Sequence, residues 1–314
     1  MKILVVSGFL GAGKTTFIKM LTQKTGKKFI VLENDYAQAD IDSALLRAST
    51  DLNIYELTEG CVCCSMKQDF ASSILTISNT LDPEYLVVEP TGVAKLSNII
   101  NNIRRIQYEQ IILLKPVTML DGKTFTEGIH TYGDIFTDQL VAADKIIVTK
   151  MEQSYAEELQ KLEENVRYYN TDAKMLMSHY SEQPTEWWNS LFSDYLDEDF
   201  APTPESETEE KTDVETLSLT SPSLASPIQL IKILEGVVSG VFGSVIRAKG
   251  FLTCGQTWLS FDVVDKLYSI TGIEPTDEQQ ARCVFIGKDI NHKWLHELLQ
   301  PSHKPIRIRP KRMK

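Results

Sequence analysis

The sequence predicts an α/β fold, a mostly parallel sheet with flanking helices, followed by a smaller α+β domain. Three observations support this prediction. Short β-branched runs alternate with segments of helical periodicity up to about residue 195, a Pro/Ser/Thr-rich acidic stretch then interrupts the chain, and mainly strand-like runs follow. Alternating strands and helices are typical of a parallel sheet that is covered on both faces.

The first strand leads directly into a glycine-rich loop. The apolar run Ile3–Val6 precedes Gly8–Thr15, which matches the phosphate-binding pattern of a P-loop NTPase. Glycines allow the backbone N–H groups to point at phosphate, Lys14 supplies positive charge to the β- and γ-phosphate oxygens, and the Thr15 hydroxyl can bind Mg²⁺. A helix is expected from Thr16 onward. The residues expected to contact nucleotide here are Gly8, Gly11, Ala12, Gly13, Lys14, Thr15 and Thr16.

The other elements follow from the same periodicities. In the first part, strands are predicted at Phe29–Glu33, Asn53–Leu57, Tyr85–Glu89, Gln110–Leu114 and Lys145–Lys150, with a helix at Met66–Ile77. In the second part, strands are predicted at Val214–Leu219, Ser244–Leu252, Thr257–Val263 and Arg282–Ile286, with helices at Pro227–Val238 and Asn291–Leu299. We therefore expect a nucleotide-binding domain at 1–195, an acidic linker at 196–212, an α+β domain at 213–303 and a basic tail at 304–314.

Two acidic segments complete the expected phosphate site. Glu89 ends an apolar strand and is followed by a turn containing Gly92, a layout typical of an element that holds Mg²⁺ through water and senses the γ-phosphate. Asp42 lies in an acidic loop and is a candidate for the Mg²⁺ or attacking-water shell. We expect Lys14, Glu89 and Asp42 to be the catalytic residues, and Gly92 to approach the nucleotide.

Three thiols gather in Cys61-Val62-Cys63-Cys64, in a glycine turn before a helix. Clustered thiolates favour Zn²⁺, Cu⁺ or iron, and three sulfurs leave one tetrahedral position open for His, Glu or a client protein. Such an open position suits metal transfer or sensing, while the alternative is three structural cysteines. Cys254 and Cys283 stand alone in strand-like runs and are expected in the core.

Composition excludes several classes of function. The net charge of −11 argues against nucleic acid as the main partner, and no apolar run reaches the length needed to span a membrane. Five cysteines, with three of them packed together, do not form the pattern of a disulfide framework. We therefore expect a cytoplasmic protein, with a homodimer as one possible assembly.

These motifs together resemble those of the CobW-type P-loop GTPases, the metallochaperone group related to UreG and HypB. The resemblance rests on Gly8–Thr15, Glu33-Asn34, Glu59–Cys64 and Glu89–Gly92, and in the second domain on Ser244–Leu252 and Val284–Lys288. It implies GTP hydrolysis coupled to binding or delivery of a transition metal, Zn²⁺ or Co²⁺, to a client metalloprotein. The implied metal ligands are Cys61, Cys63 and Cys64, to which Glu33 can contribute.

The chain departs from the family pattern in three places. Thr149-Lys150-Met151-Glu152 stands where an Asn-Lys-x-Asp motif usually reads guanine, so that Thr149 loses a bracing carboxamide. Glu152 can still accept both guanine N–H donors if the loop absorbs its extra methylene, which keeps GTP ahead of ATP. Ala37-Gln38 replaces a common Gly-Glu pair, and the five histidines are scattered, which argues against metal storage.

Two other functions fit the same motifs. The chain could be a nucleotide-dependent activator of a metalloenzyme or corrinoid protein, with only structural cysteines, or a P-loop kinase acting on a small molecule. Release of free phosphate would indicate hydrolysis, whereas a phosphorylated small molecule would indicate transfer. The matched motifs contain no arginine finger or water-orienting glutamine, so slow intrinsic hydrolysis is expected.

Overall fold

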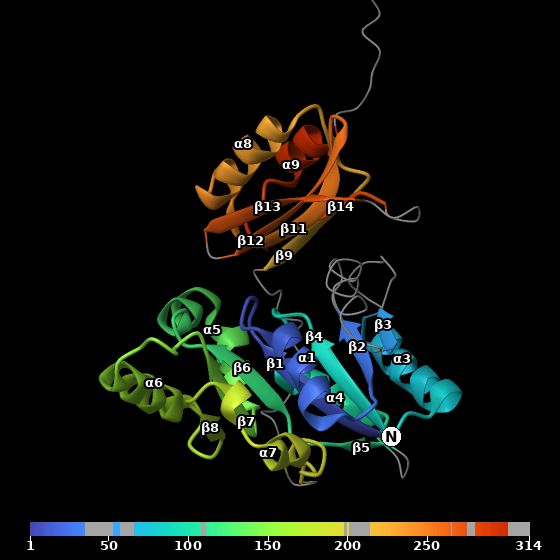
Figure 1. Ribbon diagram of the computed structural model, residues 1–314, viewed down its shortest axis with the longest axis vertical. Coiled ribbons are helices and arrows are strands. Elements are labelled where there is room, and N and C mark those ends of the chain that lie inside the picture. The colour runs from blue at the N-terminus through green and yellow to red at the C-terminus, as the bar shows by residue number, and fades with distance from the viewer. Residues whose placement is uncertain are drawn as a thin grey trace, which may run out of the picture. The chain divides into compact units, whose positions relative to one another are not determined.

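The computed structural model describes residues 1–34, 53–56, 66–107, 111–197, 200, 214–264, 266–274 and 280–300. The chain divides into two compact units, Met1–Glu210 and Lys211–Lys314, and Figure 1 shows the elements of each. Within the described residues, no helix is both long and apolar enough to cross a membrane.

The first unit is built on a parallel sheet, as predicted. Its strand order is β3-β2-β4-β1-β6-β7-β8, with β5 also beside β1 (Figure 1). All its ladders are parallel. The strands are β1 (Lys2–Gly8), β2 (Ile30–Asn34), β3 (Asn53–Glu56), β4 (Tyr85–Pro90), β5 (Ile112–Leu113), β6 (Val117–Asp121), β7 (Lys145–Thr149) and β8 (Lys174–Leu176).

Helices cover both faces of this sheet because successive strand residues point to opposite sides. On β1, Ile3 and Val5 enter one core, and Leu4 and Val6 enter the other. The first core also contains residues of α3 (Met66–Leu81), α4 (Leu96–Arg105), α5 (Phe125–Val141) and α6 (Ala156–Tyr169). The second contains residues of α1 (Lys14–Thr25) and α7 (Thr185–Ser190).

One predicted strand was too long and its neighbour was missed. Within the described part of Gln110–Leu114, only Ile112–Leu113 forms a strand, and β6 begins just beyond Pro116, where no strand was predicted. Proline has no N–H to donate to a ladder, so the apolar stretch splits into two strands along the same edge of β1. Lys2 pairs with Ile112 and Val6 with Val117.

The end of the first unit is fixed by ion pairs and apolar contacts. The buried ammonium of Lys145 lies 2.6 Å from an oxygen of Asp194, and Lys115 Nζ lies 3.1 Å from an oxygen of Asp144. The hydrogen bond to Asp144 is the main cause that raises the pKa of Lys115 above its ordinary value. Leu196 and Phe200 pack against the first core, so folded contacts continue past residue 195.

The second unit is the predicted α+β domain. Its six-stranded sheet has the order β13-β12-β11-β14-β9, with β10 beside β11, and all ladders except β10-β11 are antiparallel. Apolar side chains of both helices pack with strand residues in one core. Its elements are β9 (Glu215–Thr220), β10 (Ser223–Leu224), α8 (Pro227–Val238), β11 (Ser244–Cys254), β12 (Thr257–Val264), β13 (Leu267–Ile273), β14 (Arg282–Lys288) and α9 (His292–Leu299).

Candidate nucleotide site

The P-loop forms a tight turn between β1 and α1. Gly8 has φ 138°, and a Cβ atom there would lie 2.3 Å from the Met119 carbonyl oxygen, so no side chain fits. Gly13 has φ 93° and caps α1 without a side-chain hydrogen bond. The first N–H groups of a helix have no partner within the helix, and they carry its partial positive charge. This turn can therefore bind an anion through its backbone.

Lys14 lies inside the loop that it is expected to serve. It is 8% exposed, and its ammonium donates to the carbonyl oxygens of Gly8 at 3.0 Å and Phe9 at 3.4 Å. Two backbone carbonyls of the loop thus hold the Lys14 ammonium in place. Phosphate oxygens are stronger acceptors than neutral carbonyls, so the same ammonium can turn to a bound triphosphate.

Thr15 and Glu89 meet, although they are far apart in the sequence. The Thr15 hydroxyl donates to Glu89 Oε1 at 2.9 Å. Glu89 pairs in register with Glu33 on β2, and both residues fall on the α1 side of the sheet, because their neighbours Val87 and Val31 enter the core there. Glu33 is 4% exposed. The carboxyl ends of β2 and β4 therefore place two acidic residues next to the start of α1.

The turn after β4 rests directly on the P-loop. A Cβ atom on Gly92 would lie 2.6 Å from the backbone nitrogen of Leu10. The buried side chain of Gln139 on α5 donates to the carbonyl oxygens of Gly92 at 3.0 Å and Ala94 at 2.8 Å. The close approach to Leu10 explains the glycine at position 92, and the hydrogen bonds from Gln139 tie the turn to α5.

We expect Gly92→Ala to weaken triphosphate binding by about tenfold, because a buried methyl group against backbone costs roughly 1–3 kcal/mol. Isothermal calorimetry with a non-hydrolysable GTP analogue would measure the loss. Gly133→Ala is the matched control, since a Cβ atom there meets nothing within 4 Å. Equal affinities of the two variants would show that the contact with Leu10 has no bearing on binding.

The expected base-reading segment lies at the carboxyl end of β7. The Thr149 hydroxyl donates to the Ala12 carbonyl oxygen of the P-loop at 3.1 Å and to that of Leu120 at 3.2 Å, so this side chain connects β7 to the P-loop. Lys150 has φ 62°, and its ammonium lies 2.6 Å from a carboxylate oxygen of the buried Asp121. Glu152 Oε1 accepts from the Lys150 backbone N–H at 3.2 Å. The substituted motif thus remains a fixed polar loop attached to the P-loop.

The family model described as "CobW/HypB/UreG, nucleotide-binding domain" matches residues 2–177 of the chain. The chain belongs to this CobW/HypB/UreG family. A second model, "Cobalamin synthesis protein cobW C-terminal domain", matches residues 214–301, so both units of the CobW-family chain are covered. The fold is therefore that of a P-loop NTPase followed by a separate antiparallel domain, as predicted.

Curated relatives of the CobW-family chain are named as zinc chaperones. "Zinc chaperone YjiA" of Escherichia coli is 25% identical over 300 residues, which cover 91% of this chain and 93% of YjiA. "Zinc chaperone YeiR" of the same organism is 31% identical over 179 residues, covering 56% of this chain and 54% of YeiR.

Two solved structures are also similar to this chain. The Zn(II)-bound YjiA GTPase from E. coli has a TM-score of 0.45 at 19% identity, covering 95% of this chain and 97% of YjiA. Nickel-bound HypB from Helicobacter pylori has a TM-score of 0.44 at 18% identity, covering 61% of this chain and 85% of HypB.

The predicted site residues outside the described ranges are Asp42, Cys61, Cys63 and Cys64, and the Ala37-Gln38 pair lies outside them as well. Their predicted roles stay predictions. Among the described residues, no group of three or more His, Cys, Asp or Glu side chains is placed to hold a metal ion. Cys254 and Cys283 are buried free thiols, as predicted. Burial raises the pKa of both thiols, that of Cys283 well above its ordinary value, so neither offers a thiolate at neutral pH.

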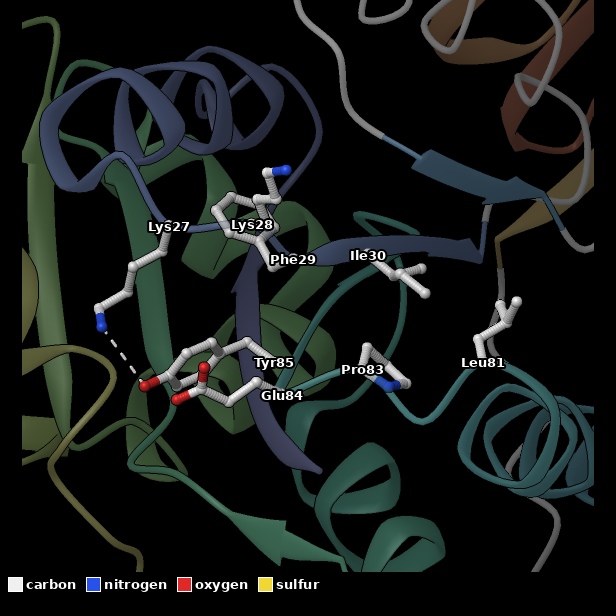
Figure 2. Close-up of a pocket in the computed structure, with 8 residues that line it drawn as sticks. All are labelled: Lys27, Lys28, Phe29, Ile30, Leu81, Pro83, Glu84 and Tyr85. Atoms are coloured by element: carbon white, nitrogen blue, oxygen red, sulfur yellow. Dashed lines mark hydrogen bonds between the residues drawn. The ribbon is translucent and has the colours of Figure 1, made fainter.

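A cavity of about 530 Å³ lies at the opposite edge of the sheet from the P-loop, at the amino ends of β2 and β4 (Figure 2). In it, Lys27 Nζ points to the Tyr85 hydroxyl oxygen at 3.4 Å. Ligands of open α/β sheets bind at the carboxyl ends of the strands, so this cavity is not the nucleotide site. It is lined by Lys27, Lys28, Phe29, Ile30, Leu81, Pro83, Glu84 and Tyr85.

Three residues that contact the candidate site residues were not predicted from the sequence. Gln139 holds the turn after β4, Asp121 holds Lys150, and His179 lies beside Glu152. Asp121 could have been found from its place at the end of an apolar run, since carboxylates at strand ends were noted elsewhere. Gln139 and His179 have no such signal, because a helix and a loop after a short strand bring them to the site.

Proposed function

We propose that this chain is a GTP-hydrolysing metallochaperone that binds zinc through its Cys-x-Cys-Cys segment and delivers it to a client metalloprotein. The single observation that carries the proposal is the junction of Thr15, Glu89 and Glu33. The P-loop helix and the carboxyl ends of β2 and β4 meet there, so a nucleotide site and a metal site can share the same strands. The zinc-chaperone names of the curated relatives support the metal half.

The nucleotide half of the proposal rests on fixed charge. Lys14 and the P-loop amides would hold the β- and γ-phosphates, and the loop at Lys150 would hold the base. Preorganised donors that stabilise developing charge supply most of the catalysis in phosphoryl transfer. Water would attack the γ-phosphate, and Asp42 is the residue proposed to orient it.

The donor set also fits Mg²⁺. A hydroxyl and a carboxylate 2.9 Å apart offer the hard oxygen ligands that this ion prefers. Thr15 would ligate it directly and Glu89 through water. When bound, the ion neutralises charge on the β- and γ-phosphate oxygens. Thr15 and Glu89 already hold each other in place for this task.

For zinc, the proposed ligands are the thiolates of Cys61, Cys63 and Cys64 with the carboxylate of Glu33. Zn²⁺ prefers tetrahedral sites of thiolate, imidazole and carboxylate. Glu33 and Glu89 occupy paired positions on neighbouring strands. A change at the phosphate side of β4 would therefore be felt at the metal side of β2, and nucleotide state would alter zinc affinity.

We expect zinc affinity, measured by competition with a chromogenic chelator, to differ at least about fivefold between the complexes with a GTP analogue and with GDP, as typical coupling free energies predict. Glu33→Gln should weaken zinc binding by about 10–100-fold. The matched control is Glu84→Gln, because Glu84 lies at the opposite end of the same strand pair. The same protein should release free phosphate from GTP. Equal zinc affinity in both nucleotide states would refute the coupling, and a phosphorylated small molecule in place of free phosphate would refute hydrolysis.

A further inference from the structure

His179 and Glu152 meet at the base-binding end of the site. They follow β8 and β7, which are neighbouring parallel strands, so their loops emerge at the same edge of the sheet. His179 Nε2 lies 3.8 Å from Glu152 Oε1. Side chains from two different loops thus face each other where a nucleotide base would lie.

The hydrogen bonds of His179 determine the tautomer of its ring, that is, which nitrogen carries the proton when the ring is neutral. Nδ1 lies 3.3 Å from the backbone nitrogen of Ser181, which can only donate, so Nδ1 is the acceptor. In the neutral ring the proton therefore sits on Nε2, the nitrogen nearer Glu152. Nε2 therefore carries a hydrogen on the side of Glu152 whether the ring is neutral or protonated, at a separation of 3.8 Å, which is longer than a hydrogen bond.

The position of the His179 ring is also fixed by packing. It stacks on Tyr180, with ring centroids 4.4 Å apart and an interplanar angle of 24°. Tyr180 is 4% exposed and makes edge contacts with Phe17 of α1 and with Trp188. Through Tyr180, the imidazole thus packs against the core that contains α1, whereas Glu152 lies on an exposed loop.

Glu152 needs such support more than the usual aspartate does, because its side chain has one more rotatable bond. Its Oε1 accepts from the Lys150 backbone N–H at 3.2 Å, which anchors one of the two carboxylate oxygens. A carboxylate with one oxygen anchored can accept from both N–H groups on the Watson–Crick edge of guanine. Adenine places a ring-nitrogen lone pair at that position, which repels a carboxylate.

We propose that His179 is a positioning residue for base specificity: it holds the Glu152 carboxylate in the orientation that accepts guanine and rejects adenine. The inference rests on the proposed function, in which a guanine nucleotide is the substrate. In this proposal His179 supports the Glu152 side chain, which is longer than the usual aspartate and needs more support. The proposed role concerns recognition of the base and not of the phosphates.

The test uses the full chain and equilibrium competition binding of GTP, inosine triphosphate and ATP. His179→Phe keeps the aromatic stack on Tyr180 and removes the N–H donor. We expect it to lower the preference for GTP over ATP by about tenfold, as the loss of one contact to a carboxylate predicts, with ATP affinity unchanged. His179→Gln, which restores an N–H donor, should recover most of the preference.

A double-mutant cycle with Glu152→Ala separates positioning from a general structural effect. In the Glu152→Ala background, His179→Phe should have no further effect on GTP affinity, because the group that it positions is gone. His292→Ala is the control, since His292 makes a similar contact with Glu215 in the second unit, at 2.8 Å. It should leave all three affinities unchanged.

The outcomes are distinguishable. Wild-type protein that binds ATP as tightly as GTP would refute the guanine preference of the proposed function itself. Wild-type protein that prefers GTP, combined with an unchanged preference in His179→Phe or an equal loss in both backgrounds, would refute only the role of His179.

Discussion

Lys14→Ala is expected to reduce the rate of nucleotide hydrolysis by about 10²–10³-fold, the usual effect of removing one preorganised donor from a charged transition state. The ammonium is 8% exposed and is held over the loop by two carbonyl oxygens. Substitution therefore removes a charge that the loop holds in a fixed position. Single-turnover measurement of phosphate release at saturating nucleotide would give the change in the chemical step.

Lys19→Ala provides the control for this variant, because Lys19 lies on α1 but outside the P-loop. It changes the charge of the same helix by the same amount. Unchanged hydrolysis in Lys19→Ala and a large loss in Lys14→Ala would assign the effect to the phosphate site. If both variants retained wild-type rates, Lys14 would have no catalytic role. Circular dichroism would check that α1 still forms in both.

The second large effect is expected for zinc. Replacing Cys63 and Cys64 together by alanine should weaken zinc binding by at least about 100-fold, since two proposed thiolate ligands are lost and structural Zn²⁺ sites depend on all of theirs. The remaining buried thiols cannot compensate, because burial raises the pKa of Cys254 and, more strongly, of Cys283. Competition with a chelator of known affinity would measure the change.

Val62→Ala is the matched control, because it alters the same segment without removing a sulfur. It should retain one tightly bound zinc ion per chain. If the Cys63/Cys64 double variant also retained one equivalent of zinc, these thiols would not be the ligands. Nucleotide affinity measured on the same samples would show whether the P-loop remains intact, and it is expected to stay unchanged in the absence of metal.

Much of the fold could be predicted because its signals are local. The P-loop, the apolar strands around it and the helix at Pro227–Val238 each follow from a short run of residues, and these predictions were confirmed. The strand β6 was missed because Pro116 divides one apolar run into two strands. The strand β13 was missed because most of its residues are exposed, so its sequence lacks the alternation of a half-buried strand.

The candidate site divides in the same way. Thr15 and Glu89 were each predicted to lie at the Mg²⁺ side, and in the structure the Thr15 hydroxyl donates to Glu89. Contacts made by Gln139 and His179 could not be predicted, because a polar residue on an amphipathic helix or in a loop usually faces water. Only the packing of α5 and of Tyr180 turns these two side chains inward.

The bonds from Gln139 to Gly92 and Ala94 have a mechanical consequence. A turn held by two hydrogen bonds to one side chain cannot shift alone: it must break both or carry α5 with it. The carbonyl oxygen of Gln139 also accepts from the Thr118 hydroxyl at 2.8 Å, so this helix is tied to β6 as well. If this turn moves when the γ-phosphate is lost, α5 would therefore move with it, on the β6 side of the sheet. A spectroscopic label near the far end of α5 would then report each round of nucleotide hydrolysis.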